Sequence, residues 1–265
     1  MTITSVHNPL VRQLRKLQQP KERAASQLFL VEGTHAVAAA LATHWPLALA
    51  LATGAWQSAH PELAAALEAG AERFEEVSEA ALASIAETTT PSGVVAAARR
   101  REHDWRAHPI DPGTAALFVL GETLQDPGNV GTIVRTVAAA GAHGLLLSAD
   151  SADPEQPKVI RASAGAWFRT PPVRVADLHA TMAELAGAGV AIVAADARAT
   201  RTLWQLDLRG PVAFVLGSEG RGLGARTLAL ATEHVAIPQR PDVESLNVAV
   251  SCALLLYEAV RQRSP

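Results

Sequence analysis

The sequence predicts an α/β fold whose second half forms a parallel sheet covered by helices. Five short apolar runs in that half are compact enough to be strands buried on both faces, and helical stretches separate them. Strands that alternate with helices pair in parallel, because each helical crossover returns the chain to the same end of the sheet. The expected strands cover residues 117–121, 144–147, 190–194, 212–216 and 234–237.

The first half predicts a smaller α/β module. It opens with a basic helical stretch and continues with an apolar run at 28–31. Ala-rich helical stretches follow near residues 35–43 and 61–69, and a turn at 91–93 leads into a last strand at 94–98. A mixture of helices and strands of this length fits a compact domain with its own core.

A domain boundary is expected after this module. The segment 102–114 combines proline, glycine and charged residues without apolar periodicity, as is typical of a linker. We therefore expect an N-terminal domain over residues 1–105, a linker over 106–114 and a C-terminal domain over 115–265.

Composition narrows the class of protein. With 49% hydrophobic residues among 265, each domain can bury a core. The chain lacks the run of about 18 apolar residues that a membrane helix needs, as well as the apolar core of a signal peptide, so we expect a cytoplasmic location. The single cysteine, Cys252, is expected to be a small buried hydrophobe. One cysteine excludes an internal disulfide and a cysteine-cluster metal site, and we expect no metal.

Charge is unevenly distributed along the chain. The net charge of −3 argues against attraction of the whole protein to nucleic acid. In the first 23 residues, however, five basic side chains stand against the single acid Glu22, which gives a local charge of five minus one, or +4. These basic residues are Arg12, Arg15, Lys16, Lys21 and Arg23. They predict contacts with phosphates, and a solvated helix face is the alternative.

Three polar segments of the second half follow expected strands and lead into apolar helical runs, where α/β folds place ligand-binding groups. In the first segment, Asn129 is expected to cap a helix, because its side-chain oxygen can accept from free amides of the first turn. Arg135 lies six residues further on among apolar neighbours. It is either a surface residue with a buried stem or a functional cation in a cleft.

The second segment, 217–224, is rich in glycine and precedes a helix expected from about Ala225. Its glycines either form a structural turn or let the backbone approach a ligand closely. A phosphate loop would end in Lys-Ser/Thr and a dinucleotide site would contain G-x-G-x-x-G, and neither pattern is present, which argues against both functions. Glu219 can accept hydrogen bonds from a ligand or from an arginine.

In the third segment, Ile237-Pro238 marks the end of an expected strand. Ser245, further along, is expected to cap an apolar helix over 248–260. Apolar residues occur nearly all round the first turns of that helix, which indicates burial on several faces and fits a subunit interface. Asn247, expected just inside the helix, needs hydrogen-bond partners either in a ligand or in a carbonyl group of its own loop.

Together the three segments resemble the motifs of the SpoU (TrmH) family of RNA ribose methyltransferases, part of the SPOUT superfamily. The matching residues are Asn129-x-Gly131-x-x-x-Arg135, Leu216-Gly-Ser-Glu-Gly-x-Gly-Leu223, Ile237-Pro238 and Ser245-Leu-Asn-Val248. Residues 4–12 and 29–33 resemble the family's ribosomal-protein-like substrate-binding domain. The resemblance implies a deep trefoil knot in the C-terminal domain, an exception among folds, a homodimer formed through that domain, and S-adenosylmethionine as cofactor.

The resemblance also implies which residues form the site. The expected cofactor-binding residues are Leu216, Gly217, Ser218, Glu219, Gly220, Ile237, Pro238, Gln239, Ser245, Leu246 and Asn247. The expected catalytic residues are Asn129, Arg135, Glu219, Ser245 and Asn247. Arg135 is also expected to contact RNA, together with the five basic residues near the N-terminus.

The implied reaction is attack of a ribose 2′-hydroxyl of ribosomal RNA on the methyl group of the cofactor. A guanidinium keeps its proton near neutral pH, so we assign Arg135 the stabilisation of the developing alkoxide or of an adjacent phosphate, with Glu219 positioning it. The chain departs from the family pattern at Gln239 and Pro241, where methionine and glycine are usual. Proline fixes φ and removes an amide donor, so the loop beside the cofactor is expected to follow a different path.

Several alternatives stay open at this point: transfer RNA as substrate, methylation of a base, a Rossmann-type methyltransferase, and a non-catalytic RNA-binding or ribosome-assembly protein. Position argues against the Rossmann type, because its glycine-rich loop follows the first strand of the domain, far from 217–224. The presence of Arg135 and Asn247 argues against a non-catalytic protein. The sequence names neither the RNA nor the nucleotide, nor whether the modification serves housekeeping or antibiotic resistance.

Overall fold

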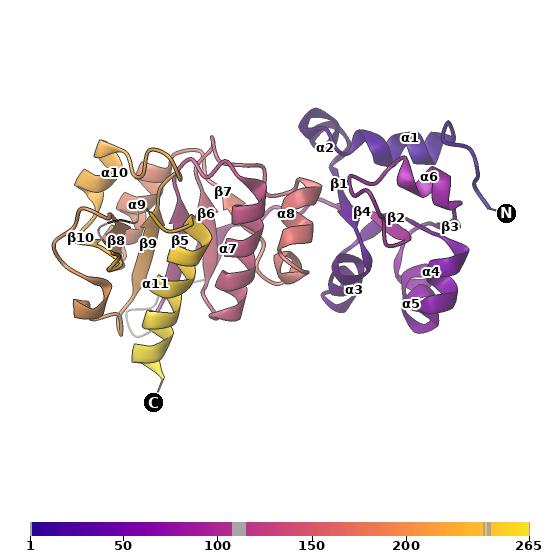
Figure 1. The fold of residues 1–265 in the computed structure, drawn as a ribbon. Coiled ribbons are helices and arrows are strands. Elements are labelled where there is room, and N and C mark those ends of the chain that lie inside the picture. The colour runs from indigo at the N-terminus through magenta and orange to yellow at the C-terminus, as the bar shows by residue number, and fades with distance from the viewer. Residues whose placement is uncertain (1, 108–114, 241, 243–244, 265) are drawn as a thin grey trace. The chain divides into compact units, whose positions relative to one another are not determined.

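The computed structural model describes residues 2–107, 115–240, 242 and 245–264. The chain forms two compact units (Figure 1). The N-terminal unit comprises Met1–Glu102 together with Glu155–Arg169, and the C-terminal unit comprises His103–Pro154 together with Thr170–Pro265.

The C-terminal unit is built on a six-stranded sheet in which all neighbouring strands are parallel, which confirms the predicted fold class. The strand order is β10-β8-β9-β5-β6-β7. The strands are β5 (Leu117–Gly121), β6 (Gly144–Leu147), β7 (Val173–Arg174), β8 (Ala191–Ala195), β9 (Val212–Leu216) and β10 (Glu233–Val235). The sequence did not predict β7, because two residues are too short for an apolar run.

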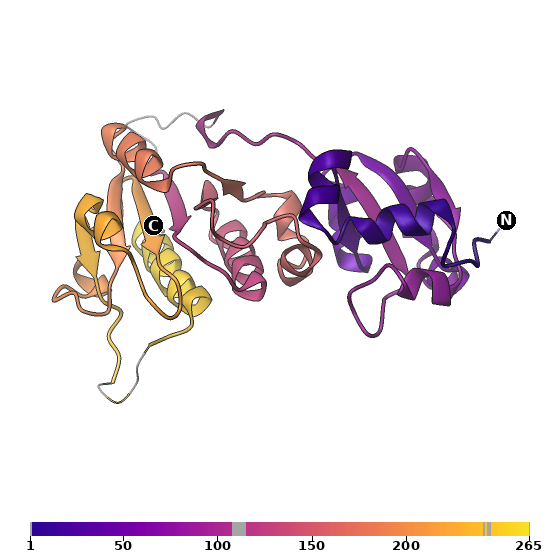
Figure 2. The ribbon, with the colours of Figure 1, turned by 90° about the horizontal axis from the view of Figure 1, so that it is seen from above.

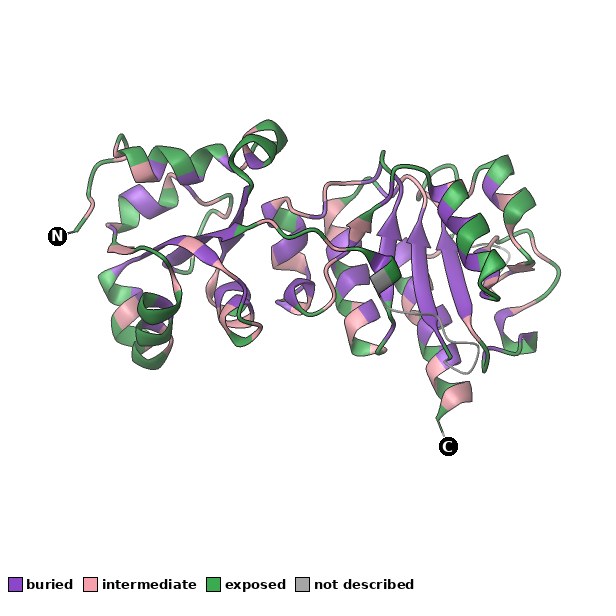
Figure 3. Ribbon diagram, turned by 180° about the vertical axis from the view of Figure 1, so that it is seen from behind, coloured by how far each residue is buried: buried purple, intermediate pink, exposed green. Residues whose placement is uncertain are grey.

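The centre of this sheet is fully buried. Every residue of β5 and β9 is buried, which explains why their sequences are apolar without alternation. Figure 3 shows the buried strands between helices whose outer sides are exposed. The carboxyl ends of all six strands meet at one edge of the sheet, because the strands are parallel.

Helices cover both faces of the C-terminal sheet (Figure 2). Helices α7 (Pro127–Ala139) and α11 (Val248–Arg263) lie on one face, and α9 (Leu178–Gly187) and α10 (Ala225–Leu230) lie on the other. None of the helices in the described part of the chain is long and apolar enough to span a membrane. The trefoil knot that the resemblance implies stays a prediction.

Helix α11 has a buried side and an exposed apolar side. Cys252 is 1% exposed, and burial raises the pKa of its thiol to about 12, so it is the small buried hydrophobe that the sequence predicts. Val250, Leu254 and Tyr257 are large hydrophobic residues that remain exposed to solvent. The expectation that the helix is buried on several faces therefore does not hold within a single chain.

The N-terminal unit contains a mixed four-stranded sheet of order β1-β4-β2-β3. Its strands are β1 (Leu28–Glu32), β2 (Leu47–Ala52), β3 (Phe74–Glu76) and β4 (Val94–Arg99). Its helices are α1 (Pro9–Lys16), α2 (Pro20–Ser26), α3 (Thr34–Ala42), α4 (Gly54–Ala59), α5 (Pro61–Gly70) and α6 (Glu79–Ala83). Val11 and Leu14 of α1 and Leu82 of α6 pack into one core with the strands.

Residues 155–169 belong to the N-terminal unit although they stand between β6 and β7 in the sequence. Helix α8 (Pro157–Ala162) packs on β1, and Arg161 Nη1 donates to Glu32 Oε2 at 2.9 Å. Glu32 is 3% exposed and also accepts from the backbone amides of residues 87 and 88, so its charge is well compensated.

Aromatic packing reinforces this arrangement. Trp167, in the short 3-10 helix η2 (Ala166–Phe168), lies 5.0 Å from Phe29 between ring centroids. The expected boundaries place 155–169 in the C-terminal domain and so differ from the observed units here. A contact between residues 129 positions apart leaves no local pattern in the sequence.

The basic residues near the N-terminus separate into two groups. The exposed ones are Arg12, Arg15, Lys16 and Lys21. Arg23 is 2% exposed, and its Nη1 donates to the carbonyls of Leu17 and Gln18 at 2.8 and 2.9 Å. The prediction that Arg23 contacts RNA is therefore wrong, because its guanidinium satisfies carbonyls at the end of α1 instead.

Candidate active site

A cavity of about 630 Å³ lies at the carboxyl ends of β8, β9 and β10. Its volume is within the range of small-molecule sites, roughly 300–1,000 Å³. The loops that follow these three strands line it, and the start of α11 completes it. This is the position at which open parallel sheets bind ligands.

Most of the residues expected to bind the cofactor line this cavity. They are Leu216, Gly217, Ser218, Glu219, Gly220, Ile237, Gln239, Ser245 and Leu246. Pro238 and Asn247 are not among the described residues that line it. Pro241, which is expected to redirect the loop, lies outside the described residues.

The loop after β9 folds tightly on itself. Gly222 N donates to the carbonyl of Ser218 at 2.9 Å, and Gly222 has a φ of +67°, a conformation that favours glycine. A Cβ atom on Gly217 would lie 2.3 Å from the carbonyl carbon of Gly222. The loop can therefore close only because residue 217 has no side chain.

Glu122, directly after β5, anchors the end of this loop. Its Oε2 accepts from the amide of Gly224 at 2.8 Å, and its Oε1 accepts from Thr227 Oγ1 at 2.5 Å. Thr227 is fully buried and also lies 2.9 Å from His179 Nε2. The carboxylate thus fixes where the glycine-rich loop ends and α10 begins.

Replacing Glu122 by alanine is expected to weaken ligand binding in the cavity by about fivefold to tenfold, because the amide of Gly224 and the hydroxyl of Thr227 lose their acceptor. Titration calorimetry with S-adenosylhomocysteine, the demethylated form of the cofactor that the sequence resemblance implies, measures this. Glu184→Ala is the matched control, because Glu184 forms an exposed ion pair with Arg106. Equal affinities for the two variants would contradict an anchoring role for Glu122.

A chain of hydrogen bonds joins three of the expected catalytic residues at the edge of the cavity. Asn247 Nδ2 donates to Asn129 Oδ1 at 2.9 Å, and Asn129 Nδ2 donates to Glu219 Oε1. Glu219 itself lines the cavity. Residues from all three sequence segments therefore meet at one place.

Two of these residues occupy different helix positions from those expected. Asp126, and not Asn129, caps α7, because its side chain accepts from the amide of Asn129 at 2.8 Å. Proline at the first position of α7 already marks the helix start before residue 129. Asn247, and not Ser245, caps α11 by accepting from the amides of residues 249 and 250. Because only the side-chain oxygen of Asn247 caps α11, its side-chain nitrogen Nδ2 can donate to Asn129.

Arg135 is exposed on α7, and its guanidinium has no hydrogen bond or ion pair with another described residue. The expected pairing of Glu219 with Arg135 is therefore absent from the described part of the chain, because Glu219 bonds Asn129 instead. Because Arg135 is exposed and its guanidinium is unpaired among the described residues, the guanidinium is available to a substrate, nearly two helical turns along α7 from Asn129.

The loop after β8 also contributes to the cavity, although its residues were not predicted from the sequence. Asp196 and Arg198 line the cavity, and Arg198 Nε donates to Asp196 Oδ1 at 3.1 Å. Burial opposes ionisation of Asp196, but hydrogen bonds from Arg198 hold the pKa of its carboxyl below the usual value. The rule that ligands bind at the carboxyl ends of parallel strands applies to β8 as well and was the available signal.

Comparison with known proteins identifies the family. Residues 116–257 match the model of the SpoU rRNA Methylase family, and residues 8–96 match the MRM3-like substrate binding domain. The chain belongs to the SpoU rRNA methylase family.

Relatives of this SpoU protein span its whole length. A protein of Synechocystis sp. named as an uncharacterized tRNA/rRNA methyltransferase is 44% identical over 262 residues, which cover 99% of this chain and 94% of the relative. The 23S rRNA (guanosine(2553)-2′-O)-methyltransferase RlmP of Bacillus subtilis is 31% identical over 255 residues, with 96% and 97% covered. The structure of an AdoMet-bound rRNA methyltransferase from Sinorhizobium meliloti has a TM-score of 0.88 at 30% identity, with 100% and 99% covered.

The SpoU protein is thus an S-adenosylmethionine-dependent RNA methyltransferase, which confirms the expected cofactor. The residues that line the cavity are suited to bind S-adenosylmethionine. Asp196 and Glu219 supply carboxylates for a ligand with two cationic centres, and the glycine loop leaves space beside the backbone. Among the described residues, no group of three or more His, Cys, Asp or Glu is arranged to hold a metal ion.

Proposed function

We propose that this methyltransferase modifies a ribose 2′-hydroxyl, in ribosomal RNA. The observation that carries the proposal is the hydrogen-bonded chain from Asn247 through Asn129 to Glu219 at the cavity edge, with Arg135 exposed on the same helix as Asn129. A hydroxyl nucleophile needs polar groups that fix its position and a cation that stabilises the developing oxyanion. The similarity to the Bacillus subtilis enzyme, named as a 2′-O-methyltransferase of 23S rRNA, supports this choice.

S-adenosylmethionine, when bound, supplies an electrophilic methyl group. Glu219 lines the cavity and is held by Asn129, so its position is fixed before RNA arrives. Arg135 stabilises negative charge on the attacking oxygen or on a neighbouring phosphate, because its guanidinium keeps its proton and offers a planar fork of donors. Ser245, at the cavity wall, offers a hydroxyl to the bound ligand.

We assign RNA recognition to residues 1–105 and catalysis to residues 115–265, in a cytoplasmic protein. The exposed basic residues of α1 and α2 support RNA binding by the first region, and the match to a substrate-binding domain agrees with it. The four residues involved are Arg12, Arg15, Lys16 and Lys21.

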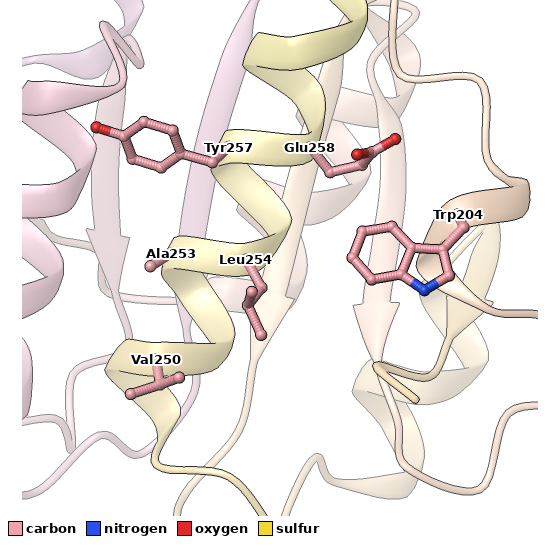
Figure 4. Close-up of a pocket in the computed structure, with 6 residues that line it drawn as sticks. All are labelled: Trp204, Val250, Ala253, Leu254, Tyr257 and Glu258. Carbon is pink, nitrogen blue, oxygen red and sulfur yellow. The ribbon is translucent and has the colours of Figure 1, made fainter. Parts of the chain in front are cut away.

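We also propose a homodimer formed through α11. Val250, Leu254 and Tyr257 project from successive turns of this helix, and Trp204 of the short helix η3 (Leu203–Gln205) faces it across an apolar groove (Figure 4). These four side chains are between 36% and 55% exposed in the single chain. Contiguous exposed apolar side chains of this size are typical of an interface between subunits.

Replacing Leu254 by glutamate is expected to dissociate this dimer, raising its dissociation constant by about 100-fold or more, because a charge would be buried without a partner. Sedimentation equilibrium measures the change. Leu230→Glu is the control, because Leu230 is similarly exposed, at 38%, but lies on α10 outside the groove. A variant with Leu254→Glu that remains as dimeric as the control would rule out this interface.

The function is tested by transfer of radiolabelled methyl from S-adenosylmethionine to unmodified ribosomal and transfer RNA, followed by nuclease digestion. Label in an alkali-resistant 2′-O-methyl dinucleotide from ribosomal RNA is the expected result. Label in a base would identify a base as the methyl acceptor instead of the ribose. Label in transfer RNA alone would identify transfer RNA as the substrate instead of ribosomal RNA. Cofactor binding without label on any RNA would favour a non-catalytic RNA-binding protein.

A further inference from the structure

Gln239 presents a buried hydrogen-bond acceptor that no described residue of the protein uses. Its side chain lines the cofactor cavity, and its Oε1 atom is buried without a hydrogen-bond partner among the described residues. An unpaired buried acceptor is destabilising, so such an atom is retained where a ligand supplies the donor. The family pattern has methionine here, and a thioether is only a weak acceptor that would leave no comparable orphan.

Gln239 and Glu219 line the cavity from loops that follow different strands. Glu219 follows β9, Gln239 follows β10, and β8 lies between these two strands. Strands are spaced about 4.8 Å apart, so the ends of β9 and β10 are separated by roughly 10 Å across the sheet. Gln239 is not part of the hydrogen-bonded chain of Asn247, Asn129 and Glu219, so a cofactor with its methyl group beside that chain can present another part to Gln239.

The surroundings of Gln239 fit the adenine ring. Val235 and Ile237 line the cavity from the same chain segment and provide apolar surface for a flat ring. The carboxylates of Asp196 and Glu219 are the better acceptors for the charged ammonium group and for ribose hydroxyls. A neutral carboxamide instead matches the edge of adenine, which offers an amine donor beside a ring-nitrogen acceptor.

We propose that Gln239 recognises the adenine of S-adenosylmethionine. Its Oε1 accepts a hydrogen bond from the exocyclic 6-amino group, and its Nε2 donates to the adjacent ring nitrogen. The side chain thereby selects the adenine base, a task that the methionine of the family pattern cannot perform through hydrogen bonds. The inference concerns the cofactor alone and does not depend on whether the methyl acceptor is a ribose or a base.

The test compares two ligands in the absence of RNA. Titration calorimetry measures the dissociation constants of S-adenosylhomocysteine and of its analogue with hydrogen in place of the 6-amino group. The wild-type protein is expected to bind the analogue about tenfold more weakly, because the buried oxygen of Gln239 then stays unpaired. In Gln239→Met, the two ligands are expected to bind within twofold of each other.

Two further variants complete the design. Gln13→Met, at an exposed position on α1, is the matched control and should keep the tenfold preference. Gln239→Glu retains an acceptor and should keep more of the preference than Gln239→Met, which provides a second measurement if the methionine variant folds poorly. An undiminished preference in Gln239→Met, or no preference in the wild-type protein, would overturn the proposal. Failure of the wild-type protein to bind either ligand would overturn the cofactor assignment with it.

Discussion

Replacing Arg135 by alanine is expected to lower the rate of methyl transfer by about 100-fold to 1,000-fold, the usual effect of removing one group that stabilises transition-state charge. Affinity for the cofactor should change less than twofold, because Arg135 is exposed on α7 and is not among the residues that line the cavity. Single-turnover assays with saturating RNA measure the rate, and calorimetry with S-adenosylhomocysteine measures the affinity.

Two variants separate charge from geometry at this position. Arg135→Lys keeps the positive charge but loses the planar fork, so it should recover only part of the lost rate. Arg209→Ala is the control, because Arg209 is an exposed arginine of the same unit that pairs with Asp207. Full activity of Arg135→Ala would remove this residue from the catalytic set, and a parallel loss of cofactor affinity would indicate a structural role instead.

The parallel sheet could be predicted because its signal is local. Strands β5, β6 and β9 are continuous apolar runs with the expected bounds, since both of their faces are covered. The convergence of the three polar segments followed from the same reasoning, because the loops after the carboxyl ends of parallel strands share one edge of the sheet. The meeting of Asn129, Glu219 and Asn247 is the geometric outcome.

Features that depend on partners distant in the sequence could not be predicted. Arg23 is one of five similar basic residues among the first 23, and only the fold reveals that its guanidinium donates to carbonyls at the end of α1. The attachment of residues 155–169 to β1 depends on Glu32, 129 positions from Arg161. The predicted helix caps were wrong for another reason. Asp126 and Asn247 cap the two helices, but Asn129 and Ser245 nearby have similar capping propensity, so the sequence does not show which residue caps each helix.

Replacing Gly217 by alanine is expected to weaken cofactor binding by about tenfold or more, because overpacking in a closed loop forces the backbone to move. The added Cβ would lie 2.3 Å from the carbonyl carbon and 2.4 Å from the carbonyl oxygen of Gly222, and neither backbone atom can rotate away as a side chain would. Relief requires opening the turn between Ser218 and Gly222, and both residues line the cavity. Calorimetric titration with S-adenosylhomocysteine measures the loss.

Gly210→Ala is the matched control for this substitution, because no atom lies within 4 Å of the Cβ position at Gly210, which precedes β9 in the same unit. It carries the same change in backbone entropy and should bind the cofactor as the wild-type protein does. If Gly217→Ala also bound normally, the closed turn would not be the conformation that binds the cofactor. Weaker binding with an unchanged melting temperature would instead localise the effect to the loop, because the buried strand that precedes it would be intact.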